Sequence, residues 1–136
     1  MNVMPSRKAL WLAVLLLTGC AGTIDSSTLA SKLSDPEGRP VVVDVRTGSE
    51  YATGHLPGAV NIPVQALPFR MAAVPVQGRS EPVVVYCAHG PRAGLAGIFL
   101  RLAGFSKVLH LQGDILTWRD EGRSLVTGPA PGDPVK

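Results

Sequence analysis

The sequence contains few of the residues that bind metals. It has two cysteines and three histidines among 136 residues. His55, His89 and His110 lie far apart in the chain, and no Cys-x-x-Cys pair is present. Zinc sites are recognised by closely spaced sulfur and nitrogen ligands, so the sequence predicts no metal site.

No apolar run is long enough to cross a membrane. Arg7 and Lys8 precede an apolar stretch over residues 9–17, whereas a spanning helix needs about 20 apolar residues. A basic start, a short apolar stretch and small residues after it are typical of an export signal. We therefore expect residues 1–19 to be a signal peptide.

The end of this signal resembles a bacterial lipobox, Leu17-Thr18-Gly19-Cys20. The resemblance implies that Cys20 is acylated after cleavage just before it, and two or more acyl chains give stable anchoring. The residue after Cys20 is Ala21, and this resembles the sorting signal of lipoproteins for the outer membrane rather than the inner membrane. We expect a lipid-anchored domain in the periplasm of a bacterial envelope; the alternative is an ordinary secretory signal cleaved near Ala21-Gly22.

The expected mature chain has almost equal numbers of basic and acidic side chains. The formal net charge is +3, but Arg7 and Lys8 are two of the 13 basic residues, and all 10 acidic residues lie at or after Asp25. Eleven basic and 10 acidic side chains then remain from Cys20 onward. Nucleic-acid binding loses its electrostatic support, so no nucleic-acid partner is predicted.

The most informative segment is an apolar run, 83–86, that ends on Cys87. A short loop with Gly90 follows, and Pro91 suits the first turn of a helix. The N–H groups at the start of a helix lack intrahelical partners and favour a thiolate or a bound oxyanion. Cys87 is therefore a candidate nucleophile, and the alternative is a small buried residue at a strand end.

The rest of the chain alternates predicted strands and helices. Strands are expected over 41–45, 59–62, 83–86 and 107–111, and helices over 28–33, 91–102 and 115–121, with broken helix over 65–73. Ser26 or Ser27 is expected to cap the first helix. This order predicts an α/β domain with a small, mostly parallel sheet, helices on both faces, and the site at a carboxyl end of a strand.

Three blocks of sequence resemble the single-domain rhodaneses, including envelope members of the phage-shock type. The blocks are Asp44-Val45-Arg46 with Glu50-Tyr51 and Gly54 to Pro63, Val84 to Cys87 with Gly90 and Arg92-Ala93, and Gly104-Phe105 with Val108, Leu111, Gly113 and Trp118. One departure is Asp114, where many members carry a second glycine. We expect the rhodanese domain over 37–125, a lipidated tether and short helix over 20–36, and a flexible tail over 126–136.

The resemblance implies a sulfurtransferase without a metal or organic cofactor. Cys87 takes sulfane sulfur from thiosulfate or a related persulfide donor and passes it to a thiol or cyanide acceptor through a cysteine persulfide. The loop from Ala88 through His89, Gly90, Pro91 and Arg92 to Ala93 is expected to bind substrate, with Arg92 presenting a planar fork to sulfonate oxygens. His89 is either a donor-binding residue or an exposed loop residue.

Other residues of the pattern are expected to be structural. Asp44 and Arg46 are predicted to form an ion pair at a strand end, and Glu50 follows Arg46 at helical i,i+4 spacing. His55 is predicted to be hydrogen-bonded within a turn, and Trp118 to pack in the core.

Two other classes of function remain open at this point. Cysteine-dependent phosphatases and arsenate reductases resemble a Cys-x5-Arg pattern, whereas Cys87 and Arg92 are spaced as Cys-x4-Arg. The shorter loop leaves less room for a phosphoryl group with three equatorial oxygens. The second alternative is a persulfide carrier or binding module that delivers sulfur to a partner protein.

Overall fold

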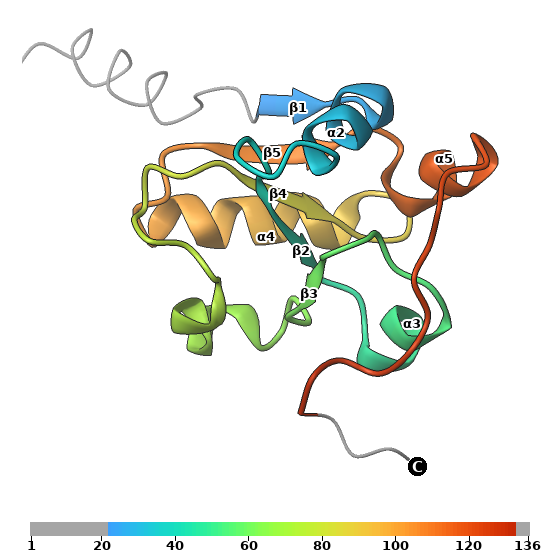
Figure 1. The fold of residues 1–136 in the computed structure, drawn as a ribbon. Coiled ribbons are helices and arrows are strands. Elements are labelled where there is room, and N and C mark those ends of the chain that lie inside the picture. Colours follow the sequence, from blue (N-terminus) through green and yellow to red (C-terminus); the bar gives the residue numbers. More distant parts are fainter. Residues whose placement is uncertain (1–21, 133–136) are drawn as a thin grey trace, which may run out of the picture.

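The computed structural model describes residues 22–132, which form an α/β domain around a five-stranded sheet (Figure 1). The strands pair in the order β1-β5-β4-β2-β3, and every pairing is parallel. Their bounds are β1 Gly22–Ile24, β2 Val41–Asp44, β3 Val60–Asn61, β4 Val83–Tyr86 and β5 Val108–Leu111. The α/β class and the predominantly parallel sheet are confirmed.

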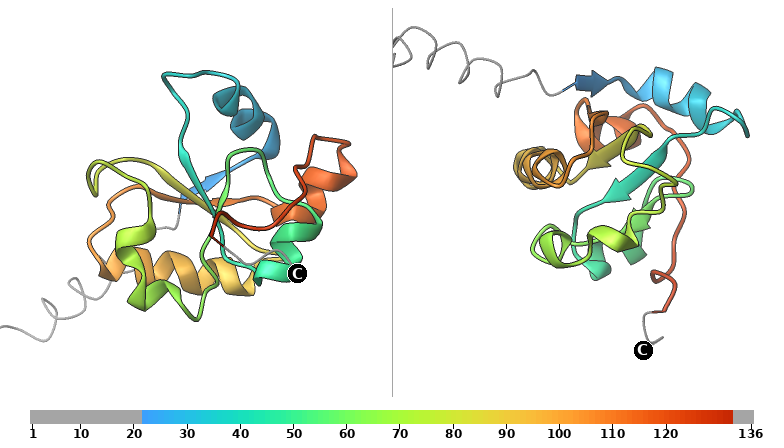
Figure 2. Two further views of the ribbon diagram at one scale, coloured as in Figure 1. Left: turned by 60° about the horizontal axis from the view of Figure 1, so that its bottom comes forward. Right: turned by 90° about the vertical axis from the view of Figure 1, so that its left-hand side faces the viewer.

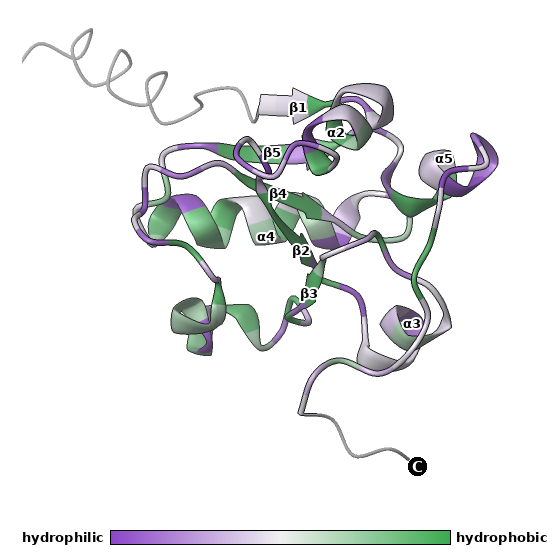
Figure 3. Cartoon of the chain, in the orientation of Figure 1, coloured by the Kyte–Doolittle hydropathy of each residue, from purple (hydrophilic) through white to green (hydrophobic). Residues whose placement is uncertain are grey.

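The central strands are apolar because both faces of the sheet are covered. Successive side chains of a strand point to opposite faces, so β4 sends Val83 and Val85 into one core cluster and Val84 and Tyr86 into the other. β2 divides Val42 and Val43 in the same way. Figure 3 shows that these two strands, at the centre of the domain, are mostly hydrophobic.

Helices cover both faces, as predicted. α4 (Pro91–Leu102) packs on one face together with the 3₁₀ turns η1 (Leu67–Phe69) and η2 (Met71–Ala73). α2 (Ser26–Leu33), α3 (Gly48–Thr53) and α5 (Asp114–Asp120) contribute Leu29, Tyr51 and Ile115 to the core on the other face. The right-hand view of Figure 2 separates α4 from α2 on opposite sides of the sheet.

The N-terminal part of the domain differs from the prediction in two details. Residues 22–24 are a strand rather than tether, since β1 pairs with β5 through Ile24 opposite Leu111. The cap of α2 is Asp25, whose carboxylate accepts the Thr28 N–H at 2.8 Å, so the helix begins at Ser26. Asp25 is as good a cap as serine, and its position one residue earlier lengthens the helix.

The segment expected as a flexible tail makes backbone contacts at its start. Val126 and His55 exchange backbone hydrogen bonds of 2.8 and 2.9 Å, and the Gly128 N–H donates to the Ala52 carbonyl. These bonds tie residues 126–128 to α3 and the turn after it. Between residues 22 and 132, no helix is long and apolar enough to span a membrane.

All five strands run the same way, so the sheet has one edge where strands begin and an opposite edge where they end. Gly22 begins β1 at the first edge, whereas Cys87 follows β4 at the second. The sheet itself therefore separates the start of the described chain from the candidate nucleophile.

Candidate active site

Cys87 lies where β4 meets the loop that leads into α4. Its side chain is 1% exposed, and the Gly90 N–H points at its sulfur with an N–Sγ distance of 3.0 Å. Gly90 has a φ of +125°, a conformation that side-chain-bearing residues rarely adopt, so this position favours glycine. A backbone N–H aimed at this position can hold a negatively charged group there.

The residues predicted to bind substrate follow in one loop and the first turn of α4. Ala88 and Gly90 are half-buried, His89 and Pro91 are exposed, Arg92 is half-buried and Ala93 is buried in the core. Cys20 lies outside the described residues. His89 therefore stands at the loop surface, and it has no hydrogen-bonded partner among the residues the structure describes.

Arg92 is paired with Glu50 of α3. Its two terminal nitrogens contact the two carboxylate oxygens at 2.7 and 3.0 Å, so the planar fork expected to face a sulfonate is occupied. The hydrogen bonds from Arg92 lower the pKa of Glu50 to about 2. Glu50 also completes a capping box with Thr47, which fixes the first turn of α3.

A buried ion pair fixes the neighbouring loop, as predicted. Two guanidinium nitrogens of Arg46, Nε and Nη2, bond to the Asp44 carboxylate, with the Nη2–Oδ2 distance at 2.6 Å. The same Nη2 donates to the Gly54 carbonyl, and the Tyr86 hydroxyl donates to Asp44 Oδ2. Burial raises the pKa of Tyr86 well above its ordinary value. The expected i,i+4 partner of Arg46, Glu50, bonds to Arg92 instead.

Asp114 is the site residue that the sequence interpretation missed. In the sequence it is only a departure from the family's second glycine, yet its Oδ1 accepts the backbone N–H of Cys87 at 2.9 Å. His110 Nε2 lies 2.9 Å from the same oxygen, and the Ile115 N–H donates to the Cys87 carbonyl. The start of α5 thus holds both backbone polar groups of Cys87. The signal in the sequence was a carboxylate at a position where the family often has glycine.

The other singled-out residues have structural contacts. The His55 ring stacks on Tyr51 with centroids 3.6 Å apart, and its Nδ1 lies 2.8 Å from the Tyr51 carbonyl oxygen. Trp118 is buried in the core, and its indole N–H donates to the Ser124 carbonyl. The residues that the structure describes contain no group of three metal-ligating side chains.

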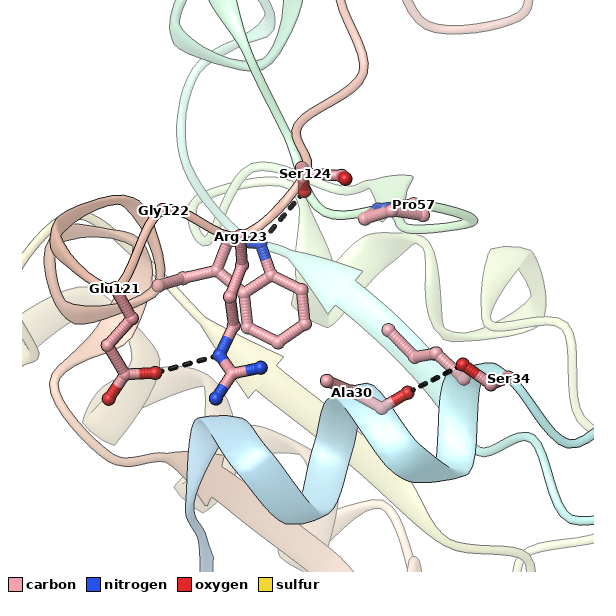
Figure 4. Close-up of a pocket in the computed structure, with 9 residues that line it drawn as sticks. Ala30, Ser34, Pro57, Glu121, Gly122, Arg123 and Ser124 are labelled. Carbon is pink, nitrogen blue, oxygen red and sulfur yellow. Dashed lines mark hydrogen bonds and ion pairs between the residues drawn. The ribbon is translucent and has the colours of Figure 1, made fainter.

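A surface cavity of about 480 Å³ lies between α2 and the end of α5 (Figure 4). Its lining includes Ala30 and Ser34 on one side and Glu121 and Arg123 on the other, and Trp118 also lines it. Glu121 and Arg123 are paired at 2.7 Å. None of the residues of the Cys87 loop lines this cavity, so the cavity is separate from the loop.

The fold and the loop together define a class: an α/β domain with a buried cysteine in a glycine-bearing loop at the end of a parallel strand. The family model for the rhodanese-like domain matches residues 26–121. The chain belongs to the rhodanese-like domain family.

Curated relatives agree with this assignment. A protein of Allochromatium vinosum named "Sulfurtransferase" is 37% identical over 103 residues, which cover 76% of this chain and 92% of the relative. "Thiosulfate sulfurtransferase GlpE" of Stutzerimonas stutzeri is 34% identical over 79 residues, covering 58% of this chain and 70% of the relative. Several further relatives are matched over only 29% of their own length. The family and these relatives support sulfurtransferase activity in the broad sense.

A solved structure has the same fold. The Alr3790 protein from Anabaena sp. superposes with a TM-score of 0.70 at 31% identity, covering 76% of this chain and 82% of that one. This likeness confirms the rhodanese-like fold.

Proposed function

We propose that this protein transfers sulfane sulfur from thiosulfate or a related donor to a thiol or cyanide acceptor. The Cys87 thiolate attacks the outer sulfur of thiosulfate, the S–S bond breaks, and sulfite leaves with the electron pair. The acceptor then attacks the outer sulfur of the Cys87 persulfide, and the thiolate returns. The two half-reactions form a covalent ping-pong scheme. The observation that carries the proposal is the Gly90 N–H directed at the Cys87 sulfur at 3.0 Å.

The loop and its neighbours supply the remaining functions. The amides of residues 88–93 hold the negative charge of the persulfide, as oxyanion-type donors do. Arg92 contributes through its ion pair with Glu50, which fixes the first turn of α4 against α3. His89, at the loop surface, is proposed to bind the donor.

The same residues also suit a persulfide carrier that passes sulfur to a partner protein, because only the acceptor differs. Phosphatase chemistry is the weaker alternative. Its transition state needs space for three equatorial oxygens and charge stabilisation from a free cation. Cys87 and Arg92 are only five positions apart, and the guanidinium of Arg92 already binds Glu50.

A substrate panel tests this proposal. We expect the full chain to form thiocyanate from thiosulfate and cyanide, with parallel-line kinetics as each substrate is varied, because the scheme is ping-pong. Aryl phosphates serve as the comparison and are expected to react more slowly than thiosulfate. Faster hydrolysis of aryl phosphate than sulfur transfer would overturn the assignment.

We further propose that Cys20 is a lipid anchor that holds the domain in the periplasm, at the outer membrane. One residue separates Cys20 from Gly22, so at most about 8 Å of backbone joins the acylated cysteine to β1. Gly22 starts β1 at the edge opposite Cys87. The anchor would therefore turn the Cys87 loop away from the bilayer and toward soluble donors and acceptors.

The anchor makes a second testable prediction. Wild-type protein is expected to fractionate with outer membranes and to carry acyl mass on a peptide that begins at Cys20, since several acyl chains give lasting attachment. Cys20→Ala is expected to block processing or release the domain. Unacylated wild-type protein, cleaved elsewhere and recovered in the soluble periplasm, would contradict the anchor.

A further inference from the structure

The Cys87 loop is surrounded by more negative than positive charge. Two carboxylates hydrogen-bond to the loop: Glu50 binds Arg92, and Asp114 binds the Cys87 N–H. Arg92 is the only arginine or lysine between Cys87 and Ala93, and its charge is matched by Glu50. The Asp44–Arg46 pair beside the site is likewise neutral as a unit. Within residues 22–132, Asp114 has no arginine or lysine partner, and the titratable side chain that contacts it is His110.

The geometry places the Asp114 carboxylate directly beneath the loop. Asp114 is 3% exposed, and its Oδ1 receives the Cys87 N–H. Its Oδ2 lies on the side of Gly90, since a Cβ built at Gly90 would be 3.7 Å from it. The carboxylate thus lies between the backbone of the nucleophile and the glycine whose N–H holds the sulfur. A negatively charged donor at Cys87 would come close to this buried carboxylate. Like charges repel more strongly where little water screens them.

We propose that Asp114 and Glu50 make this site select sulfane-sulfur donors that carry less negative charge than thiosulfate. Thiosulfate brings two negative charges to the loop, whereas organic thiosulfonates and monoanionic persulfides bring one. Methanethiosulfonate is the matched probe, because a methyl group replaces one charged oxygen. The Cys87 thiolate takes its outer sulfur, the S–S bond breaks, and methanesulfinate leaves with the electron pair. This inference rests on the proposed sulfur transfer and names the donor class for it.

Asp114 also has a positioning role that can be separated from its charge. Its φ of +53° lies in the left-handed region, which asparagine and glycine tolerate as well. Asp114→Asn keeps an oxygen for the Cys87 N–H and removes the charge. Asp114→Gly removes both. The two variants therefore divide the effect of the hydrogen bond from the effect of the charge.

The experiment measures the ratio of kcat/KM for methanethiosulfonate to kcat/KM for thiosulfate with the full chain. All variants and both donors are measured at one fixed pH. Asp114→Asn is expected to lower the ratio at least about threefold, because the dianion gains more than the monoanion from the lost repulsion. Glu50→Gln removes the charge that matches Arg92, retains the capping box with Thr47, and is expected to lower the ratio similarly. Glu81→Gln, a charge loss in the loop before β4 at the opposite edge, is the control and should leave the ratio unchanged.

Asp114→Gly provides the readout for positioning. It is expected to lower the ratio as Asp114→Asn does, while kcat falls for both donors because Cys87 loses its backbone anchor. The amide proton resonance of Cys87 should shift upfield in the glycine variant and stay near its wild-type position in the asparagine variant, since only glycine removes the acceptor.

The outcomes separate this inference from the proposed function. If wild-type protein takes sulfur from neither donor, the proposed function fails, and the donor preference fails with it. If both donors react but Asp114→Asn and Glu50→Gln leave the ratio within twofold of wild type, charge does not select the donor and the inference is overturned. Glu50 is partly exposed, so its variant keeps the test decisive even if an Asp114 variant fails to fold.

Discussion

Arg46→Ala is expected to destabilise the domain by about 3 to 5 kcal/mol, since removing one partner of a buried ion pair leaves an uncompensated charge. Asp44 and Arg46 are almost completely buried, with side-chain exposures of 0% and 4%. Asp44 would keep the Tyr86 hydroxyl and the Arg46 backbone N–H as donors but would lose its countercharge. The loss should appear as a lower midpoint in urea unfolding, followed by circular dichroism.

Arg119→Ala is the matched control for Arg46→Ala. Arg119 is exposed on α5, and surface substitutions usually change stability by less than about 0.5 kcal/mol. The pair of variants distinguishes the loss of a buried ion pair from the loss of any arginine. A change below about 1 kcal/mol for Arg46→Ala would contradict the structural role assigned to the Asp44–Arg46 pair.

Cys87→Ser is expected to lower thiocyanate formation from thiosulfate and cyanide by at least about 10³-fold, because removing a covalent nucleophile abolishes the intermediate. Serine is close in size to cysteine, and its hydroxyl can accept the Gly90 N–H, so the far-UV spectrum should be unchanged. Ala72→Ser, exposed in η2 and outside the Cys87 loop, is a suitable control because it introduces a serine without touching the site. Undiminished turnover by Cys87→Ser would show that another group carries the reaction.

Much of the fold could be predicted because its signals are local. The runs 41–44 and 83–86 are almost entirely valine, and strands buried on both faces of a parallel sheet have this character. Pro91 and Gly104 bracket α4 at the positions where helices favour proline and glycine. The position of Cys87 at the end of β4 follows from the same local pattern.

Other features depend on contacts between distant residues. β1 has only three residues, and nothing in Gly22–Ile24 marks a strand until β5 is beside it. Glu50 was placed with Arg46 by helical spacing, yet the nitrogens of Arg46 are taken by Asp44 and Gly54, which leaves Glu50 to Arg92 from another helix. Spacing along a helix predicts only neighbours on that helix, whereas Glu50 and Arg92 meet because β2 and β4 pair in parallel and the segments that follow them start side by side.

Asp114 shows why a departure from a family pattern needs a structure to interpret it. In the sequence it lies 27 positions from Cys87 and outside the cysteine loop. The parallel pairing of β4 with β5 places the loops after both strands side by side. An acidic residue in one loop therefore reaches the backbone of the nucleophile in the other.

The most direct test of the central claim is the intact mass of the full chain after brief mixing with thiosulfate. We predict a gain of one sulfur atom, about 32 Da, located on the peptide that contains Cys87, and its loss when cyanide is added, as ping-pong transfer requires. Wild-type protein that turns over thiosulfate without this mass gain, or that carries the sulfur on a peptide without Cys87, would contradict the account.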